Sequence, residues 1–567
     1  MIFLLLKCMM KNLLILNLLD KEESLKLLQN KLVTVKSWPP ASSDLLMQIA
    51  ESCKGLPLTI VVVAGLLGNT KMESWKKILD GLSSGIVSST EHCRNTLDLS
   101  YKHLPDYLKP CLLYFGAFQE YQEISAKRLL HLWVAEGFVQ RYEMKRIQDV
   151  AEDFLNGLLR RSLIVVSKQR WDGGVKACRI HDLVREFCLQ KAKDEHFLHI
   201  LKGQNELLGF NEPQYVRRIC IFSEAKHFKQ SKLYCPRARC LVFNKEEGKI
   251  CLLDMSCIIH NFKLLRVLDI ADIDIGPRFP TEIQFLVQLA FLAIQGSFTL
   301  IPQWIAKLSN LETFILTSTE YWGLSFPGTL WNLHKLRNLY IRRVFSGCNL
   351  PLENLDSSSV LYELDRLSGV SFPMEVSMEK LMRKFPNIRT LKYTISLQDK
   401  IVIPEFLSKL ESVSVPNHFG FPRILEFCFP AHLRKLALSG FELSGRNISI
   451  IGQLPNLEVL KLMEVEFERD AWELEEGDFS KLRFLTLFSK GIVSWRACDD
   501  QFELLQKLVL RSCIQLENMP SCLVSISALE MIEVLDCSEN VETLVRKIEE
   551  EQENFGNSLR IIIQGTR

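Results

Sequence analysis

The segment Ile180-His181-Asp182 carries side chains that could do chemistry near neutral pH. An imidazole can act there as an acid, as a base or as a hydrogen-bond donor to a phosphate. A plainer interpretation is that His181 caps the helix that the next residues are expected to form. Residue types alone do not separate these two interpretations.

A second such segment is Gly55-Leu56-Pro57-Leu58. Glycine permits a tight turn, and proline is favoured at the first position of a helix because its missing N–H is not needed there. Such a turn can hold the flat ring of a ligand, or it can simply end one helix and begin the next.

No catalytic or metal-binding constellation stands out, so we expect that the protein is not an enzyme and holds no metal. The 17 cysteines are odd in number and scattered, without zinc-ligand spacing or a positioned histidine partner, and the histidines do not cluster. Scattered single cysteines are typical of a reduced, intracellular protein.

The charge balance gives no general reason to expect nucleic acid or membrane as a partner. Lys and Arg number 69 against 67 Asp and Glu, a net charge of +2. The apolar start, residues 1–11, is interrupted by lysines and lacks a cleavage site, so it does not read as a signal peptide. No apolar run reaches the ~18 residues of a membrane span. We expect a cytoplasmic protein without an integral membrane segment, and leave peripheral membrane association open.

Two helical blocks are expected before residue 193. Residues 20–80 show acidic helix starts and apolar helical spacing, including an apolar helix at 58–67 and a helix from 45 capped by Asp44. Residues 95–192 predict further helices, one of them capped by Ser125, and a hairpin around the turn 171–174. Helices plus a hairpin wing are typical of a winged-helix domain.

From about Leu265 onward one short sequence pattern, called the phrase below, is repeated. It consists of an apolar residue, two variable residues, an apolar residue, one variable residue and a last apolar residue. Its leading residues are Leu265, Leu289, Leu311, Leu336, Ile388, Leu410, Leu433, Leu457, Leu482, Leu505 and Leu529. By subtraction the steps are 22 to 25 residues, except where a degenerate repeat around Leu361 and Leu364 fills a longer gap. This period indicates leucine-rich repeats, which bury their leucines by stacking into a curved solenoid. Cys513 and Cys537 occupy a repeat position where cysteine is usually structural.

The position directly after each leading leucine forms a charged column in the later repeats. It contains Arg337, Arg389, Glu411, Arg434, Glu458 and Arg483. Neighbouring strands lie about 4.8 Å apart, so opposite charges there can pair as a ladder. One interpretation is a solvated face with pairs worth ~0–1 kcal/mol each. The other is a docking surface for a partner protein or for the winged-helix block.

Basic residues near the expected wing raise the alternative of DNA binding. They are Arg160, Arg161, Lys168, Arg170 and Lys176. Acidic residues are interspersed among them, the helix that begins near Asp149 is acid-led, and no basic arm is present. We therefore expect no nucleic-acid partner.

The order of these motifs closely resembles plant intracellular nucleotide-binding leucine-rich-repeat (NB-ARC–LRR) immune receptors of the coiled-coil class. The resemblance rests on the Gly55 turn, residues 112–115 and 132–138, the His181 segment and the repeats that follow, and it is strongest to the late-blight resistance proteins of the nightshade family. It implies an α plus α/β fold. Residues 1–90 would be a helical remnant of the nucleotide-binding region, 91–192 the winged helix, 193–212 a linker, and 213–567 the leucine-rich-repeat horseshoe.

The resemblance also implies an ADP/ATP switch with partners in these segments. Gly55, Leu56 and Pro57 match the turn whose proline packs near the adenine. His181 and Asp182 match the motif whose histidine faces the terminal phosphate of ADP; the residue before them is Ile instead of the commoner Met.

The phosphate-binding half of the family site is missing from the sequence. No GxxxxGK[ST] loop occurs in it, so the backbone cradle and the lysine for the phosphates are absent. We therefore expect weak or absent ADP/ATP binding in a family member shortened at its N-terminus, with residues 1–14 as an alternative start.

The implied function is that of a plant immune receptor that recognises pathogen-derived or guarded host proteins through its repeats and acts in defence and hypersensitive cell death. An alternative is a nucleotide-independent leucine-rich-repeat adaptor or a modulator of full-length receptors. A third interpretation is a gene fragment without stable function, since the first 90 residues lack the sheet on which they should pack and would expose Ile60 to Leu67.

Overall fold

The computed structural model forms two compact units. One comprises residues 1–201 with 212–220, and the other residues 202–211 with 221–567. The described residues are 18–32, 43–82, 88–140, 145–208, 216–222, 234–244, 258, 261–319, 324–343, 348–372, 378–395, 400–417, 426–498, 501–554 and 556–565. The alternative start expected at residues 1–14 lies outside them.

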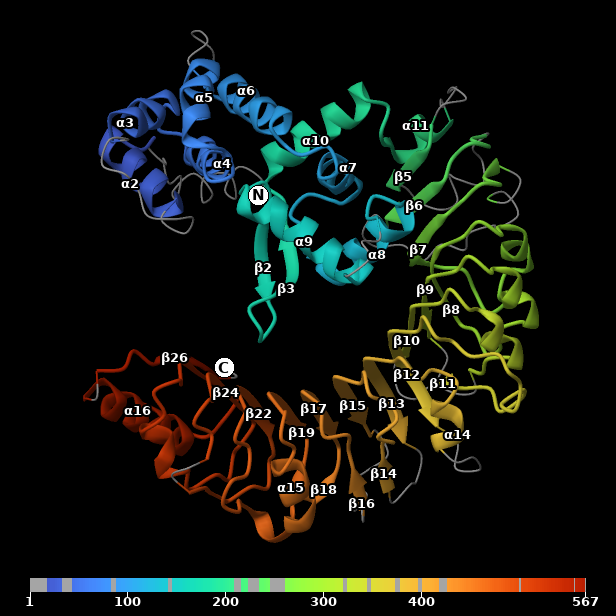
Figure 1. Ribbon diagram of the computed structural model, residues 1–567, viewed down its shortest axis with the longest axis vertical. Helices are drawn as coiled ribbons and strands as arrows, with labels where there is room; N and C mark the ends of the chain where they lie inside the picture. Colours follow the sequence, from blue (N-terminus) through green and yellow to red (C-terminus); the bar gives the residue numbers. More distant parts are fainter. Residues whose placement is uncertain are drawn as a thin grey trace, which may run out of the picture. The chain divides into compact units, whose positions relative to one another are not determined.

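The larger unit is a curved stack of parallel strands, with the strands along the inner side of the curve (Figure 1). The main strands are β6 (Cys240–Asn244), β7 (Val267–Asp274), β8 (Phe291–Gly296), β9 (Thr313–Ser318), β10 (Asn338–Arg343), β12 (Arg366–Phe372), β13 (Thr390–Ile395), β15 (Ser412–Pro416), β17 (Lys435–Ser439), β19 (Val459–Met463), β22 (Phe484–Phe488), β24 (Lys507–Arg511), β25 (Met531–Leu535) and β26 (Arg560–Gln564). The repeating apolar phrase therefore predicted these strands correctly from β7 to β25.

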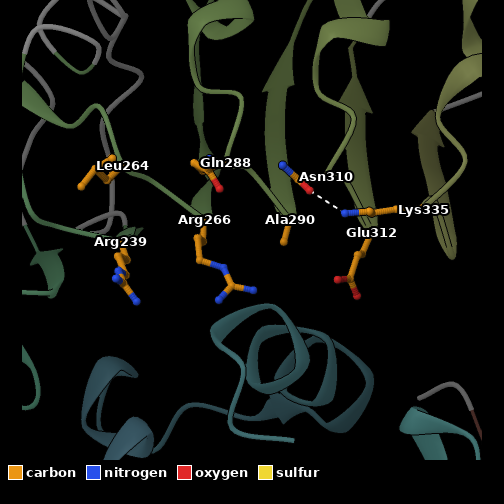
Figure 2. A pocket seen from close by; sticks show the side chains of 8 residues that line it. All are labelled: Arg239, Leu264, Arg266, Gln288, Ala290, Asn310, Glu312 and Lys335. Atoms are coloured by element: carbon orange, nitrogen blue, oxygen red, sulfur yellow. Dashed lines mark hydrogen bonds between the residues drawn. The ribbon is translucent and has the colours of Figure 1, made fainter. Parts of the chain in front are cut away.

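The second apolar residue of each phrase lies in register through the whole stack. The paired residues run in the order Leu268, Leu292, Phe314, Leu339, Leu367, Leu391, Val413, Leu436, Leu460, Leu485, Leu508, Ile532 and Ile561. Full burial of one such side chain is worth about 1.5–3 kcal/mol. Those from Leu268 to Ile532 are buried between neighbouring repeats, and Ile561, on the last strand, is half-buried. Figure 2 shows neighbouring strands of this stack side by side. One row of side chains lies at the starts of the strands, and a second row lies just before them.

Between the strands the chain returns along the outer side through short elements (Figure 1). These are the 3-10 turns η5 (Thr281–Phe285), η6 (Gln303–Lys307), η7 (Gly328–Asn332), η8 (Glu468–Asp470) and η9 (Ser521–Val524), the helices α14 (Met378–Met382) and α15 (Gly445–Gly452), and the strands β11 (Cys348–Asn349), β14 (Lys400–Val402), β16 (Glu426–Cys428), β18 (Glu442–Leu443), β20 (Glu466–Phe467), β21 (Ala471–Glu473) and β23 (Ser494–Arg496). The last repeat carries α16 (Glu539–Asn554) before β26, an addition that the phrase did not predict.

The degenerate repeat is led by Leu364, since Leu367 occupies the paired position on β12. The strand bulges between Ser368 and Val370. Gly369, at the bulge, has a φ of +82°, and a Cβ there would lie 1.8 Å from the carbonyl oxygen of Ile341. Only glycine tolerates that approach, and beyond the bulge β12 continues to pair with β13.

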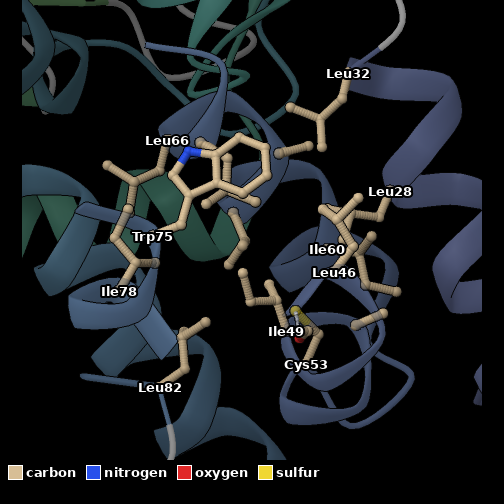
Figure 3. Packing of buried hydrophobic residues seen from close by; sticks show 14 residues of the cluster. Leu28, Leu32, Leu46, Ile49, Cys53, Ile60, Leu66, Trp75, Ile78 and Leu82 are labelled. Atoms are coloured by element: carbon tan, nitrogen blue, oxygen red, sulfur yellow. Dashed lines mark hydrogen bonds between the residues drawn. The ribbon is translucent and has the colours of Figure 1, made fainter. Parts of the chain in front are cut away.

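The smaller unit begins with a helical bundle that has its own core (Figure 3). Its helices are α2 (Lys21–Leu32), α3 (Ser43–Ser52), α4 (Pro57–Leu67), the turn η3 (Met72–Ser74), α5 (Trp75–Leu82) and α6 (Ser89–Lys102). The expected exposure of Ile60 to Leu67 is wrong, because α2 and α6 pack against the apolar helix and its buried residues share one core with residues of α3 and α5. Ile60, Val63 and Leu67 are fully buried. Neighbouring helices therefore bury α4.

The second part of this unit has the expected helices and hairpin. It comprises α7 (Lys109–Leu113), η4 (Tyr114–Ala117), β1 (Ile124–Ser125), α8 (Ala126–Glu136), α9 (Ile147–Arg160), β2 (Val165–Gln169), β3 (Val175–Arg179) and α10 (Asp182–Asp194). β2 and β3 pair antiparallel, as the turn at 171–174 predicted. Ser125 stands before α8, but the predicted side-chain cap is wrong, since its hydroxyl makes no capping bond and β1 pairs with β3 there.

The segment 193–212, expected to be a linker, contains regular structure. α10 continues to Asp194, and β4 (His199–Lys202) and α11 (Gly203–Leu208) follow. β5 (Arg218–Phe222) lies just beyond it, within the span 213–567 expected to form the repeats. No helix in the described residues combines the length and apolar character needed to cross a membrane.

Candidate functional site

The predicted turn at Gly55 joins α3 to α4. Gly55 has a φ of +70°, and a Cβ there would lie 2.3 Å from the carbonyl oxygen of Leu19. The Gly55 carbonyl accepts a hydrogen bond of 3.0 Å from the Leu19 N–H. Leu56 is the N-cap of α4 and Pro57 is its exposed first residue. Gly55, Leu56 and Pro57 therefore each have a structural role, and Pro57 is the most exposed of the three.

The predicted His181 segment begins α10. His181 has an extended backbone and is the N-cap residue. The N–H of Leu183 is shared between the ring nitrogen Nδ1 of His181, at 3.2 Å, and Oδ1 of Asp182, at 2.8 Å. Nδ1 and Oδ1 are themselves in close contact. The capping interpretation is confirmed, and it leaves Nε2 of a half-exposed ring available.

The structure brings the two segments to either side of α6. Both Thr59, in the first turn of α4, and Asp182, at the start of α10, influence the thiol of Cys93 in α6. Burial raises the pKa of the Cys93 thiol, the Thr59 hydroxyl offsets part of the rise, and the Asp182 carboxylate adds to it. The starts of α4 and α10 therefore converge on one buried cysteine, which the sequence motifs did not identify.

The space at this convergence does not fit a nucleotide. A cavity of about 30 Å³ lies between α6 and α10. It is lined by Thr90, Cys93, Arg94, Leu97, Leu183, Glu186 and Phe187. Pockets for small molecules are about 300–1,000 Å³. The lining contains one cation, Arg94, and one anion, Glu186, so it carries no net positive charge for phosphates, and the residues here do not fit ADP.

A glycine within α4 sets how closely the helical bundle packs on the winged-helix part of the same unit. A Cβ on Gly65 would lie 2.3 Å from the carbonyl oxygen of Arg161. The Asn69 amide donates to the Gly65 carbonyl at 2.7 Å and to the Arg160 carbonyl at 3.4 Å. A lone glycine in an apolar helix was the available sequence signal for this contact.

A buried ion pair holds the end of α8. The Arg218 guanidinium donates to Oε2 of Glu136 at 2.9 Å, and the two side chains are 16% and 3% exposed. Arg218 also lies over the rings of Phe138 and Phe197, at 4.9 and 4.4 Å from their centres. This cluster secures residues 132–138, one of the segments on which the resemblance rests.

The basic residues of the wing are largely engaged by acids, which weakens the DNA-binding alternative. Arg170 makes two bonds of 3.1 Å to Glu152, and Lys168 pairs with Glu123 at 2.8 Å. The half-buried Arg161 donates to the Gly157 carbonyl at 2.9 Å. Three of the five residues considered for a DNA surface are therefore held within the domain.

The segment Gly81-Leu-Ser-Ser-Gly85 spells the GxSxG pattern of hydrolase nucleophile turns. That turn needs a preceding strand to expose the serine, whereas here the pattern starts inside helix α5. Residues 83–85 lie outside the described part of the chain. The pattern alone gives no reason to assign a catalytic role.

The charged column of the repeats is paired as a ladder. Arg434 donates to both carboxylate oxygens of Glu458 at 2.8 Å, and Arg389 pairs with Glu411. Arg389 also lies 3.5 Å from Asp365. Asp365 is the ladder member of the degenerate repeat, which the sequence analysis did not place.

The ladder continues toward the earlier repeats. Arg337 lies between two acids, 3.6 Å from Glu312 and 3.3 Å from Glu363. Arg483 follows Glu458 in the column, with its N–H bonded to the Glu458 carbonyl at 2.8 Å. The pairing interpretation is therefore confirmed for Arg337, Arg389 and Arg434, and charges of alternating sign line one edge of the inner face.

Two protein families match the chain. Residues 117–188 match the disease resistance protein winged helix domain, and residues 251–557 match a leucine-rich repeat region that covers more than half of the chain. The chain belongs to the leucine-rich-repeat disease resistance proteins. The predicted winged helix and repeat horseshoe are thereby confirmed.

Curated relatives place this disease resistance protein near the late blight group. The late blight resistance protein R1-A of Solanum demissum is 34% identical over 576 residues, which cover 96% of this chain and 43% of the relative. A homologue from the same species is 34% identical over 583 residues, again covering 96% and 43%. The chain thus spans less than half the length of these relatives.

Solved structures give a weaker likeness. The plant peptide hormone receptor RGFR1, in complex with RGF2, is 15% identical, with a TM-score of 0.35 over 65% of this chain and 69% of that one. A TDR receptor is 17% identical, with a TM-score of 0.33 over 66% and 69%. Scores of this size add nothing to the assignment.

Proposed function

We propose that this disease resistance protein acts in plant defence by binding a protein partner on the inner face of its repeats. The partner would be a pathogen-derived protein or a guarded host protein that a pathogen modifies. The chain would meet this partner in the cytoplasm, and binding would promote hypersensitive cell death. The observation that supports this most is the ordered ladder of alternating charges along the inner face. Fixed charges of alternating sign favour a partner with the complementary pattern and disfavour others.

Exchanging the two charges of one ion pair tests whether a partner recognises the ladder. Arg434→Glu alone places two carboxylates together, whereas Arg434→Glu with Glu458→Arg restores an ion pair with its polarity reversed. If a partner reads the charge pattern, both variants lose binding. If the ladder only stabilises the stack, the exchanged pair recovers both stability and binding.

The measurement is binding of the purified chain to a panel of secreted proteins of the late blight pathogen and to leaf proteins that they target. Lys547→Glu, at an exposed pair with Glu551 on the C-terminal α16, serves as the control and leaves binding unchanged. A partner that binds the parent chain and the exchanged variant equally well would contradict recognition through the ladder.

We propose further that nucleotide plays little part in this chain. The absent phosphate loop and the small cavity between α6 and α10 support weak or absent ADP/ATP binding. Gly55, Leu56, Pro57, His181 and Asp182 then keep their structural roles in the turn and the helix cap.

A second candidate function is that of a nucleotide-independent adaptor or a modulator of full-length relatives. The helical bundle favours it, because its apolar helix α4 is buried in a core made by helices alone. Co-expression with a full-length relative separates the candidates: a modulator changes the relative's cell-death response, and a receptor that acts alone does not.

A further inference from the structure

The alternating ladder is interrupted at its start. Going backwards from Glu312, the column contains Ala290, Arg266 and Arg239, each joined to the next by backbone hydrogen bonds of 2.7–3.0 Å. Two positive side chains therefore stand on neighbouring strands, about 4.8 Å apart at the backbone. In the part of the chain that the structure describes, neither guanidinium has a carboxylate within ion-pair distance.

The interruption coincides with a pocket on the larger unit. The pocket has a volume of about 330 Å³. It is lined by Arg239, Leu264, Arg266, Gln288, Ala290, Asn310, Glu312 and Lys335. Figure 2 shows the side chains of Arg239, Arg266 and Glu312 extending in the same direction, with the short Ala290 between them. The methyl group of Ala290 leaves open the space that a longer ladder residue would fill.

The second row of the lining adds fixed polar groups. The Lys335 ammonium donates to Oδ1 of Asn310 at 2.7 Å, and the Asn310 amide donates to the Val287 carbonyl at 3.0 Å. Gln288 stands between Leu264 and Asn310 in the same row (Figure 2). Three cations against one carboxylate give the lining a net charge of +2.

We infer that this pocket is a binding site for a small organic oxyanion that carries phosphate or carboxylate groups. Paired guanidinium groups suit such oxygens because each presents planar N–H donors at matching spacing. Like charges on adjacent strands repel when no anion lies between them, so a bound oxyanion removes that repulsion. The volume lies at the lower end of small-molecule pockets, which favours a compact ligand over a protein surface.

The site differs in kind from the partner surface proposed above. The later ladder residues neutralise one another, whereas Arg239 and Arg266 have no such neighbour in the column. An oxyanion here would fill the gap in the ladder at β8, where the column otherwise lacks a charge.

The test is isothermal titration of the full chain with two probes, pyrophosphate for phosphate groups and citrate for carboxylate groups. We expect saturable binding of at least one, and the tighter probe identifies the group that the site prefers. Arg266→Gln removes one of the two guanidinium groups and weakens binding about tenfold or more, since hydrogen bonds between charged groups are stronger than those between neutral groups. Ala290→Glu adds a carboxylate in the gap, pairs with Arg266 and abolishes binding.

Arg434→Gln is the matched control, since this residue lies in the same column but is paired with Glu458. It leaves the affinity unchanged, and thermal unfolding confirms that all variants fold. The inference is overturned if neither probe binds at millimolar concentration or if Arg434→Gln weakens binding as much as Arg266→Gln. It is also overturned if poly-glutamate binds while both small probes do not.

Discussion

The ion pair between Arg218 and Glu136 should be the most sensitive contact in the smaller unit. Glu136 is 3% exposed in its side chain, and its second oxygen, Oε1, has no hydrogen-bond partner among the described residues. Arg218→Met keeps an apolar stem over the rings of Phe138 and Phe197 but leaves the carboxylate without its cation. Removing one partner of a buried pair costs about 3–5 kcal/mol.

This cost converts into a measurable shift of the thermal midpoint. The smaller unit comprises residues 1–201 and 212–220, or 201 + 9 = 210 residues. For a unit of this size about 1 kcal/mol lowers Tm by roughly 2–4 °C, so Arg218→Met should lower it by roughly 6–20 °C. Differential scanning calorimetry of the full chain follows this transition, and the transition of the repeats should stay in place.

Two variants make the result interpretable. Arg170→Met breaks a pair with Glu152 whose side chains are 36% and 34% exposed, and it should cost no more than ~1 kcal/mol because solvent screens both charges. Arg218→Met combined with Glu136→Gln should recover part of the loss, since no buried charge remains. A loss for Arg218→Met no larger than that for Arg170→Met would refute the reasoning.

Two further predictions concern glycine and cysteine positions. Gly55→Ala should destabilise the bundle by about 2 kcal/mol or more in urea unfolding, because φ is +70° and the new Cβ meets the Leu19 carbonyl. Gly173→Ala is the control and should cost less, since Gly173 has a φ of +74° but open space around its Cβ position. Equal losses of stability would contradict the role of the contact with Leu19. A hydrogen bond from Cys513 lowers the pKa of Cys537 to about 7, so the rate of Cys537 alkylation should rise through pH 7 and level off before pH 9. Cys513→Ala should move that midpoint upward, and an unchanged midpoint would show that the hydrogen bond is not its cause.

The repeat architecture could be predicted because its signal is local. A strand begins two residues after each leading leucine, and stacking in register follows from the period itself. The degenerate repeat could not be placed as well, since the sequence offers both Leu361 and Leu364. Register on the neighbouring strands selects Leu364 and so places Asp365 in the ladder.

The helical bundle was misjudged for a different reason. The apolar helix at 58–67 was expected to need a sheet, but packing among helices distant in sequence buries it, and periodicity cannot reveal such partners. The Arg218 and Glu136 pair spans 82 positions and was likewise invisible. The interruption of the ladder was legible in the sequence at Ala290, yet the pocket it creates depends on the curvature of the stack.

We propose that this chain recognises partners through its repeats and binds nucleotide weakly or not at all. Titration of the purified full chain with ADP and Mg²⁺ tests this most directly. The missing phosphate loop and the cavity of about 30 Å³ predict a Kd weaker than roughly 100 µM, which is a binding free energy weaker than about −5.5 kcal/mol. Saturable binding at micromolar or tighter affinity would contradict the account.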